Sequence, residues 1–349
     1  MVERGMMNQA AVWARAAAIL TAAVLACPLA HAGKTLDDIK ARGQVSCGVN
    51  TGLPGFSAAD SQGNWSGIDV DVCRAVAAAV LGDGNKVKWV PVNAQQRLTA
   101  LQSGEIDILS RNTTWTLTRD ASLGLSFTGV TYYDGQGFMV PRKSRISSAK
   151  QLRGLQVCVL AGTTTERNLT DYSRANKLNA KPIVFEKLEA TQAAYFSGRC
   201  QAYTADASAL AAARDKEAKN PDEHVILPEL ISKEPLGPAV RRGDDEWFAI
   251  VKWVLFGLIE AEEYGITQAN LDQMKSSDNP AVQRILGVSD DTGKLLGLDR
   301  EWLVRAIRTV GNYGEMFDRN VGAKSTLKIP RGLNALWNKG GIQYAPPIR

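Results

Sequence analysis

The segments RLTALQSGEIDILSRN (residues 97–112) and TQAAYFSGRCQAYTAD (residues 191–206) share one layout. Each begins with a helix-like stretch, continues with Ser-Gly, one charged residue and a strand-like stretch, and ends in a polar residue. When the Ser-Gly pairs are aligned, Asn112 falls opposite Asp206. The repetition indicates that the chain builds a similar unit twice.

A second pair of segments supports this interpretation. The segment GQVSCGVNTG (residues 43–52) is matched by GLQVCVLAGT (residues 154–163), and the match sets Cys47 opposite Cys158. Either match alone is weak. Because both occur in the same order, they predict two lobes of similar α/β construction.

Strand-like and helix-like segments alternate around these repeats. We expect strands at 44–49, 86–92, 106–110, 136–140, 155–160, 182–185 and 201–204. We expect helices at 70–81, 95–103, 166–177, 188–197 and 207–214. The alternation predicts an α/β fold with largely parallel sheets. The length of 349 residues fits two domains or one large one.

Composition and charge argue against one class of partner. The chain is 45% hydrophobic and 22% charged, with a formal net charge of +5, values that are ordinary for a globular protein. It has no basic block with interleaved aromatic residues. The sequence therefore predicts no nucleic-acid partner.

The amino terminus, residues 1–32, has the pattern of a cleavable signal peptide. Arg4 and Arg15 precede an apolar run at 16–26, which is shorter than the roughly twenty residues that span a bilayer. An Ala-His-Ala motif follows, as at a cleavage site. We expect export to the periplasm, and a lipoprotein site at Cys27 is the alternative.

Cysteine usage agrees with export. Of five cysteines, four follow the signal peptide: Cys47, Cys73, Cys158 and Cys200. An even number in an exported chain indicates disulfides, and three pairings are open. If each lobe is a unit, it contains two of these cysteines, which favours Cys47–Cys73 and Cys158–Cys200. No C-x-x-C spacing is present, so we expect neither a zinc site nor thioredoxin-type redox chemistry.

Polar residues at the ends of two predicted strands form a candidate site. The run NTTWTLTR (112–119) follows the strand at 106–110, and Asp206 follows the strand at 201–204. Ligands of open α/β sheets bind beyond the carboxyl ends of the strands. If the lobes face each other, both sets line one cleft. The alternative for the first run is a polar loop that leaves a sheet.

The chemistry of this cleft suits a zwitterion. Arg119 can bind a carboxylate with two parallel hydrogen bonds. Asp206 can pair with an ammonium, or it can cap the helix that follows. The run Gly-Thr-Thr-Thr-Glu at 162–166 has the spacing of a capping box, and the free N–H groups of a helix start also attract anions.

The sequence offers little for catalysis. Of its two histidines, His31 leaves with the signal peptide and His224 lies in a polar stretch. We find no nucleophile motif, no P-loop and no cluster with metal-ligand spacing. We therefore predict a protein that is not an enzyme and that uses no cofactor and no metal.

Several motifs, spread over nearly all of the mature chain, match one family. They are GLPGFS (52–57), GIDVDVCRAVAAAV (67–80), SGEIDI (103–108), NTTWTLTRD (112–120), YYDGQGFMV (132–140), AGTTTERN (161–168), GRCQAYTADASALAAAR (198–214), NYGEMFDRNVG (312–322) and GLNALW…GGIQYAPP (332–347). On these motifs the chain resembles the periplasmic solute-binding proteins of amino-acid ABC importers, family 3. Within the family it is most similar to the general L-amino-acid binding subunits.

This resemblance implies a two-lobe, type II periplasmic-binding-protein fold with crossovers near 133–136 and 233–236. It divides the mature chain into a first part of lobe 1 (33–135), lobe 2 (136–235), and a second part of lobe 1 with a C-terminal helical extension (236–349). It also implies that the lobes close around the ligand by a hinge motion.

The resemblance implies residue roles as well. Arg119 binds the α-carboxylate of an amino acid, and Asp206 binds its α-ammonium. The residues that assist Arg119 come from both lobes: Asn112, Thr114, Thr163 and Thr164. These roles agree with the charge argument above.

The chain also departs from the family pattern. Relatives of narrow specificity often clamp the ligand side chain between aromatic residues, whereas the best-matching positions here are Leu53 and Ala94, with Asn50 where an Asp is common. Smaller residues leave room, so we expect broad acceptance of L-amino acids. The resemblance to short binding proteins weakens along 265–349, where we expect extra helices, including an amphipathic one at 301–308, and then a Pro-containing extension.

The sequence thus predicts a monomeric periplasmic receptor that captures L-amino acids and delivers them to an inner-membrane ABC permease. The alternative is an exported enzyme on the same scaffold, such as a dehydratase or a cell-wall lyase. That alternative needs an acid or base in the cleft besides Asp206. A chemosensory receptor module is a third possibility, and we see no signalling segment to support it.

Overall fold

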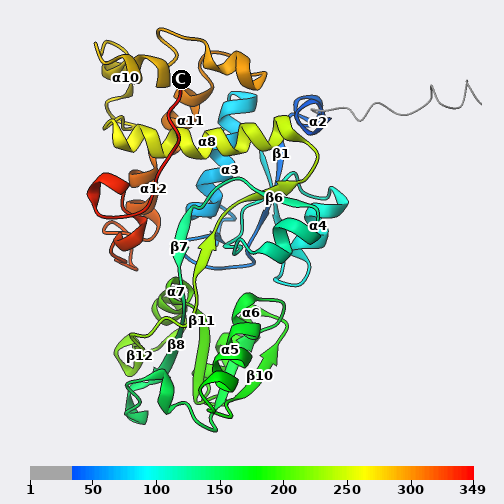
Figure 1. Ribbon diagram of the computed structural model, residues 1–349, viewed down its shortest axis with the longest axis vertical. Helices are drawn as coiled ribbons and strands as arrows, with labels where there is room; N and C mark the ends of the chain where they lie inside the picture. Colours follow the sequence, from blue (N-terminus) through cyan, green and yellow to red (C-terminus); the bar gives the residue numbers. More distant parts are fainter. Residues whose placement is uncertain (1–33) are drawn as a thin grey trace, which may run out of the picture.

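The computed structural model describes residues 34–349. The predicted signal peptide and the lipoprotein alternative at Cys27 therefore lie outside the described residues. The described chain forms two lobes, each built around a five-stranded sheet (Figure 1). Within residues 34–349, we find no helix whose length and hydropathy would let it cross a membrane.

Lobe 1 contains the sheet with the strand order β4-β1-β5-β14-β6. In that order the strands are Val87–Pro91, Val45–Val49, Ile108–Leu109, Ala239–Arg241 and Leu125–Phe127. Strand β1 pairs in parallel with β4 and β5, and β14 is antiparallel to β5 and β6. A short hairpin of β2 (Ala58–Ala59) and β3 (Trp65–Ser66) lies beside this sheet.

Lobe 2 contains the sheet with the strand order β10-β9-β11-β8-β12. In that order the strands are Lys181–Phe185, Gln156–Leu160, Ala202–Asp206, Gln136–Pro141 and His224–Ile226. Strand β9 pairs in parallel with β10 and β11, and β8 is antiparallel to β11 and β12.

The two sheets have equivalent topology, and both sequence repeats fall on equivalent strands. Strand β1 corresponds to β9, and β5 corresponds to β11. The sheets are less parallel than the sequence predicts. Strands β8 and β14 are the first that the chain forms after each passage between the lobes, and each enters its sheet antiparallel to both neighbours.

The chain passes between the lobes along β7 (Tyr132–Asp134) and β13 (Glu234–Leu236). These strands pair with each other in antiparallel register, with Glu234 opposite Asp134. Two extended, hydrogen-bonded strands form a connection that can bend at a few residues, which is the structural requirement of a hinge.

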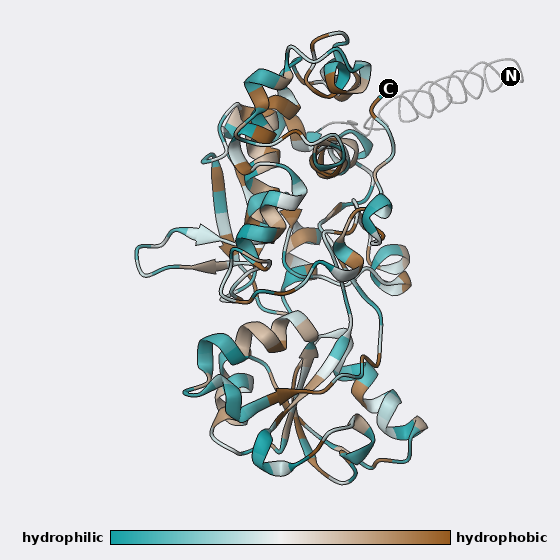
Figure 2. Ribbon diagram, turned by 90° about the vertical axis from the view of Figure 1, so that its left-hand side faces the viewer, coloured by the Kyte–Doolittle hydropathy of each residue, from teal (hydrophilic) through white to brown (hydrophobic). Residues whose placement is uncertain are grey.

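Helices cover both sheets. In lobe 1 they are α2 (Lys34–Arg42), α3 (Ile68–Leu81), α4 (Arg97–Ser103), α8 (Asp245–Glu263), α9 (Leu271–Met274), α10 (Pro280–Ile285), α11 (Trp302–Val310) and α12 (Tyr313–Asn320). In lobe 2 they are α5 (Thr164–Ala175), α6 (Leu188–Phe196) and α7 (Ala207–Glu217). Figure 2 shows apolar strands inside each lobe and polar residues on the outer helices.

Helix α8 organises the core of lobe 1. Its buried residues recur every three or four positions and include Trp247, Val251, Val254 and Leu258. This spacing forms one apolar face, which packs on α3, α11 and α12. The sequence analysis assigns no helix here, whereas the extra helices expected after residue 265 are present.

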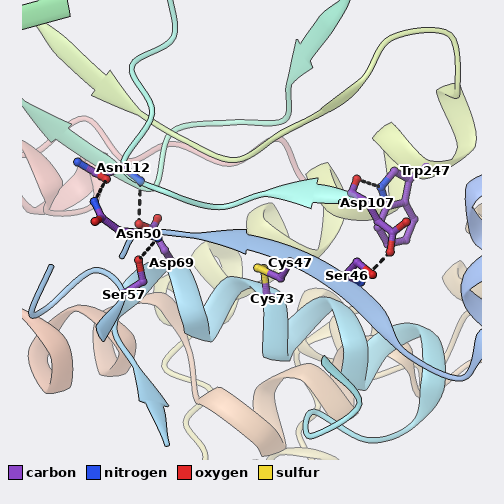
Figure 3. Close-up of a disulfide and its surroundings, with 9 residues drawn as sticks. All are labelled: Ser46, Cys47, Asn50, Ser57, Asp69, Cys73, Asp107, Asn112 and Trp247. Atoms are coloured by element: carbon purple, nitrogen blue, oxygen red, sulfur yellow. Dashed lines mark hydrogen bonds between the residues drawn. A yellow bond between two sulfur atoms is a disulfide. The ribbon is translucent and has the colours of Figure 1, made fainter. Parts of the chain in front are cut away.

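A disulfide crosslinks the interior of each lobe. Cys47 in β1 is bonded to Cys73 in α3 (Figure 3), and Cys158 in β9 is bonded to Cys200, which precedes β11. Both bonds join a central strand to a neighbouring element of the same lobe, which is the pairing that the repeated units favour.

The last residues of the chain contact the lobe 1 side of the hinge. The amide of Asn334 accepts a hydrogen bond from the Tyr133 N–H (2.7 Å) and donates one to its carbonyl oxygen (3.1 Å). The side chain of Gln343 donates to the Val130 carbonyl oxygen at 3.2 Å. The extension therefore braces the segment that leads into β7.

Candidate ligand-binding site between the lobes

A small polar cavity lies between the lobes and encloses about 50 Å³. It is lined by Asn50, Leu53, Arg97, Arg111, Asn112, Thr114, Leu160, Thr163, Thr164, Thr165, Leu188, Tyr203, Thr204, Ala205, Asp206 and Ala209. A larger cavity of about 330 Å³ adjoins it, with Thr163 and Thr164 in the walls of both. We call them the inner and the outer cavity.

The inner cavity brings together most of the predicted site residues: Asn50, Leu53, Asn112, Thr114, Thr163, Thr164 and Asp206. Arg119 lines the outer cavity instead. Ala94 lines neither of them, and it lies where the lobes meet. A Cβ atom at Gly162 of lobe 2 would come within 3.3 Å of the Ala94 carbonyl oxygen.

Asp206 ends β11 and is only 8% exposed. Its Oδ1 atom has no hydrogen-bond partner within residues 34–349. Burial raises the pKa of this carboxyl well above its usual range, and the negative charges of Asp134 and Glu234 add to the rise, while Arg97 opposes it. Asp206 makes no capping hydrogen bond to α7. The site therefore holds a buried carboxylate that lacks a close cationic partner.

Arg119 lies in a single turn at Thr118–Ser122 and is 7% exposed. Its Nη1 atom donates to the Thr114 carbonyl oxygen at 2.8 Å. Burial lowers the pKa of Arg119, whereas Glu234 and Asp206 raise it. A guanidinium carries five N–H donors, so a ligand carboxylate in the outer cavity can still use this side chain.

The threonine hydroxyls already have partners. Thr114 and Thr164 donate to Oε2 of Glu234 at 2.7 and 2.8 Å. Thr163 donates to the Leu160 carbonyl oxygen at 2.7 Å and accepts from the Glu166 N–H at 3.2 Å, as a helix cap does. The main-chain N–H groups at the start of α5 have no acceptor inside the helix, and residues Thr163, Thr164 and Thr165 at this helix start line the inner cavity.

Two buried arginines complete the inner cavity. Arg97 and Arg111 are 3% and 2% exposed. Arg111 donates to the Val92 carbonyl oxygen at 2.8 Å, whereas Nε of Arg97 has no partner within the described chain. Burial lowers the pKa of Arg97 well below its usual range, and the positive charges of Arg119 and Arg111 lower it further. An anionic group in the cavity would relieve this repulsion.

Arg97 is not among the site residues predicted from the sequence. In the aligned repeats, Arg97 stands opposite Thr191, which is fully buried in lobe 2. A charged residue at a buried position of a repeated unit requires an electrostatic reason, because an unpaired buried charge is unfavourable.

The loop that carries Asn112 is held in a fixed conformation by lobe 1 (Figure 3). Asn112 has a positive φ of 29°, outside the usual regions for a residue with a side chain. Its N–H donates to the buried Asp69 at 2.8 Å, and its Oδ1 accepts from Asn50 at 2.9 Å. Burial raises the pKa of Asp69 to about 7. These contacts fix the loop that ends in Thr114.

Within residues 34–349, no group of three or more His, Cys, Asp and Glu side chains is arranged to hold a metal ion. His224 lies away from the cavities, where its Nδ1 is 2.9 Å from the hydroxyl of Tyr195. Asp206 is the one carboxylate among the residues that line the inner cavity.

A hinged two-lobe fold with a charged cavity between the lobes defines a solute-binding protein. The chain belongs to the bacterial extracellular solute-binding proteins, family 3, which it matches over residues 45–270. This confirms the family predicted from sequence.

Three similar proteins are informative. The general L-amino acid-binding periplasmic protein AapJ of Rhizobium johnstonii is 61% identical over 95% of this chain and 98% of its own length. The glutamate/glutamine/aspartate/asparagine-binding protein BztA of Rhodobacter capsulatus is 52% identical over 92% and 95%. The structure of an ABC transporter/periplasmic binding protein from Brucella ovis with glutathione bound matches with a TM-score of 0.89. The Brucella ovis protein is 59% identical, and the match covers 90% of this chain and 99% of the Brucella ovis chain.

Proposed function

We propose that the protein is the periplasmic receptor of an amino-acid ABC importer. It captures L-amino acids between its lobes and delivers them to an inner-membrane permease. The observation that carries the proposal is the buried Asp206 carboxylate, which lacks a close cationic partner and shares a cavity wall with arginines and a helix start. A zwitterion supplies the complementary charges. The names of AapJ and BztA support this ligand class.

In this proposal the ligand spans the boundary between the inner and the outer cavity, beside Thr163 and Thr164. Its α-ammonium pairs with Asp206. Its α-carboxylate is bound by Arg119 and by main-chain N–H groups at Thr164 and Thr165, where the start of α5 favours an anion. Each charged end of the ligand is then paired with an opposite charge when it leaves water.

We propose that Arg97 and Arg111 extend the preference to side chains that end in a carboxylate or an amide. Both arginines are buried in the inner cavity, and one has an unused N–H group. The ligands in the name of BztA have such side chains. Leu53 and Asn50 line the same cavity, and we propose that they contact the ligand side chain. Ala94, the third residue proposed for this pocket, lies outside the inner cavity. The lack of an aromatic residue at Leu53 and Ala94 favours broad acceptance.

The inner cavity is smaller than the roughly 300–1,000 Å³ of ordinary ligand pockets. A ligand therefore reaches Asp206 only if the lobes separate about β7 and β13 and then close again. We propose lobe boundaries at 33–135, 136–235 and 236–349. We also propose removal of residues 1–32 on export to the periplasm, a monomeric state, and no nucleic-acid partner.

A non-enzymatic role fits the lining of the inner cavity. Among the described residues that form it, one acid and no histidine, cysteine or lysine are present. Acid–base chemistry requires a group that donates or accepts a proton at the reacting atom. The exported-enzyme alternative would have Asp206 as its one carboxylate in the inner cavity.

Isothermal titration of the mature protein, freed of bound ligand, against the twenty L-amino acids tests the proposal. We expect saturable binding of several amino acids, strongest for acidic and amide side chains, and unchanged ligands by mass spectrometry. Turnover of any ligand would favour the enzyme alternative. Absence of binding to every amino acid would refute the proposal.

A further inference from the structure

Glu234 connects the hinge to both lobes. It lies in β13 and is 1% exposed. Its Oε2 accepts hydrogen bonds from the hydroxyls of Thr114 in lobe 1 and Thr164 in lobe 2, at 2.7 and 2.8 Å. Its Oε1 accepts from Nδ2 of Asn168 at 2.8 Å and from the hydroxyl of Ser232 at 2.5 Å. One buried carboxylate thus collects donors from both walls of the site.

These contacts fix the direction of two hydroxyl protons. A threonine hydroxyl carries one proton and can donate to only one acceptor. The hydroxyls of Thr114 and Thr164 are 3.3 Å from each other, which is longer than either distance to Glu234. A charged acceptor makes the stronger hydrogen bond. Both protons therefore point to Glu234, and the hydroxyl lone pairs remain for the inner cavity, which both threonines line.

We propose that Glu234 is a positioning residue that makes Thr114 and Thr164 acceptors for the ligand ammonium. It thereby determines which end of a zwitterion lies beside Asp206. Its own negative charge disfavours an α-carboxylate at these hydroxyls and leaves that group to Arg119 and the main-chain N–H groups at the start of α5. This inference rests on the proposed function, and it replaces the expected role of the two hydroxyls as donors to the carboxylate.

Glu234→Gln tests the proposal, because it preserves size and replaces one acceptor oxygen with a donor. At least one of the hydroxyls of Thr114, Thr164 and Ser232 must then reverse its proton, and the hydroxyls that still donate lose a charged acceptor. The probes are L-glutamate and glutarate, which lacks only the α-amino group. Titration measures the affinity for L-glutamate, and displacement of bound L-glutamate measures the affinity for glutarate. We expect affinity for L-glutamate to fall about 10- to 100-fold, while affinity for glutarate changes less than about threefold.

An equal loss of affinity for both probes would overturn the proposal, because a merely structural role for Glu234 affects them alike. The matched control is Glu260→Gln. Glu260 is a buried carboxyl in α8 that accepts from the Ile348 N–H and lines neither cavity. We expect it to leave both affinities unchanged.

Thr114→Val provides a second test if Glu234→Gln does not fold. It removes the hydroxyl and keeps the carboxylate, so we expect the same selective loss for L-glutamate. An unchanged ratio of the two affinities in Thr114→Val would refute the inference. The wild-type protein distinguishes the two proposals. If it binds L-glutamate in the same titration, the proposed function is retained whatever the variants show. If it binds no amino acid, both the proposed function and the role of Glu234 are contradicted.

Discussion

Replacing Asp206 by Asn should have opposite effects on ligand affinity and on the stability of the ligand-free protein. The substitution keeps the size of the side chain and removes its charge. In the structure this charge is buried near Asp134 and Glu234, which have the same sign. In the complex the same charge is the proposed partner of the ligand ammonium.

The loss of affinity can be estimated from burial. Asp206 is 8% exposed, so solvent screens its charge little. Removing one partner of a buried ion pair costs about 3–5 kcal/mol. This corresponds to a loss of affinity of about 100- to 5,000-fold, which titration calorimetry with L-glutamate can measure.

The change in stability follows from the raised pKa of Asp206. A carboxyl with a raised pKa in the folded state contributes fully to stability below its unfolded pKa of about 3.9. That contribution is lost as pH rises through the folded pKa. At pH 8 the ligand-free Asp206→Asn variant should therefore unfold at a higher temperature than the wild type. At pH 4 the difference should become small.

A control distinguishes this effect from general damage. Asp107 is a buried carboxylate that accepts from the Ser46 N–H at 2.7 Å and pairs with Arg42, away from both cavities (Figure 3). Asp107→Asn removes a buried charge of the same kind and should leave affinity unchanged, whatever its effect on the unfolding temperature. If Asp206→Asn lowers the unfolding temperature at pH 8, the carboxylate is satisfied within the protein and our reasoning is wrong.

Further predictions concern the arginines and a disulfide. Arg119→Ala should weaken the binding of all amino acids alike. A loss of affinity below about tenfold, or 1.4 kcal/mol, would contradict the role of Arg119 at the α-carboxylate. Arg97→Gln should weaken the binding of L-glutamate and L-aspartate by about 1.5–3 kcal/mol more than the binding of L-alanine. An equal loss of affinity for all three ligands would exclude a role of Arg97 in side-chain selection. A Leu53→Trp variant should change the ranking among ligands in the same titrations. Replacing Cys158 and Cys200 by Ser should lower the free energy of unfolding by about 2–5 kcal/mol in denaturant titrations without changing affinity, and an altered affinity would show that the bond also positions the site.

Much of the fold follows from local pattern. The repeated segments predict the strand equivalence, because each apolar run of β1, β5, β9 and β11 ends in polar residues. The strands that were not predicted contain two or three residues each, too few to show periodicity; they are β2, β3, β6, β7, β12, β13 and β14. Helix α8 is different, because its apolar spacing is clear in the sequence and could have been used.

The site is only partly visible in the sequence. Asp206 and the loop at Asn112 follow from the rule that ligands bind at the carboxyl ends of strands. The role of Glu234 could not be predicted in this way, because its donors Thr114 and Thr164 lie 120 and 70 residues away. The role of Arg97 could not be predicted either, because only the packed structure shows that this side chain lines the cavity with an N–H group unused.

A crystal structure of the mature protein with L-glutamate bound tests the central claim most directly. We expect one ligand molecule to place its α-ammonium about 3 Å from the Asp206 carboxylate and its α-carboxylate on the guanidinium of Arg119. A ligand bound with these two ends reversed, or bound outside the inner and outer cavities, would contradict this claim.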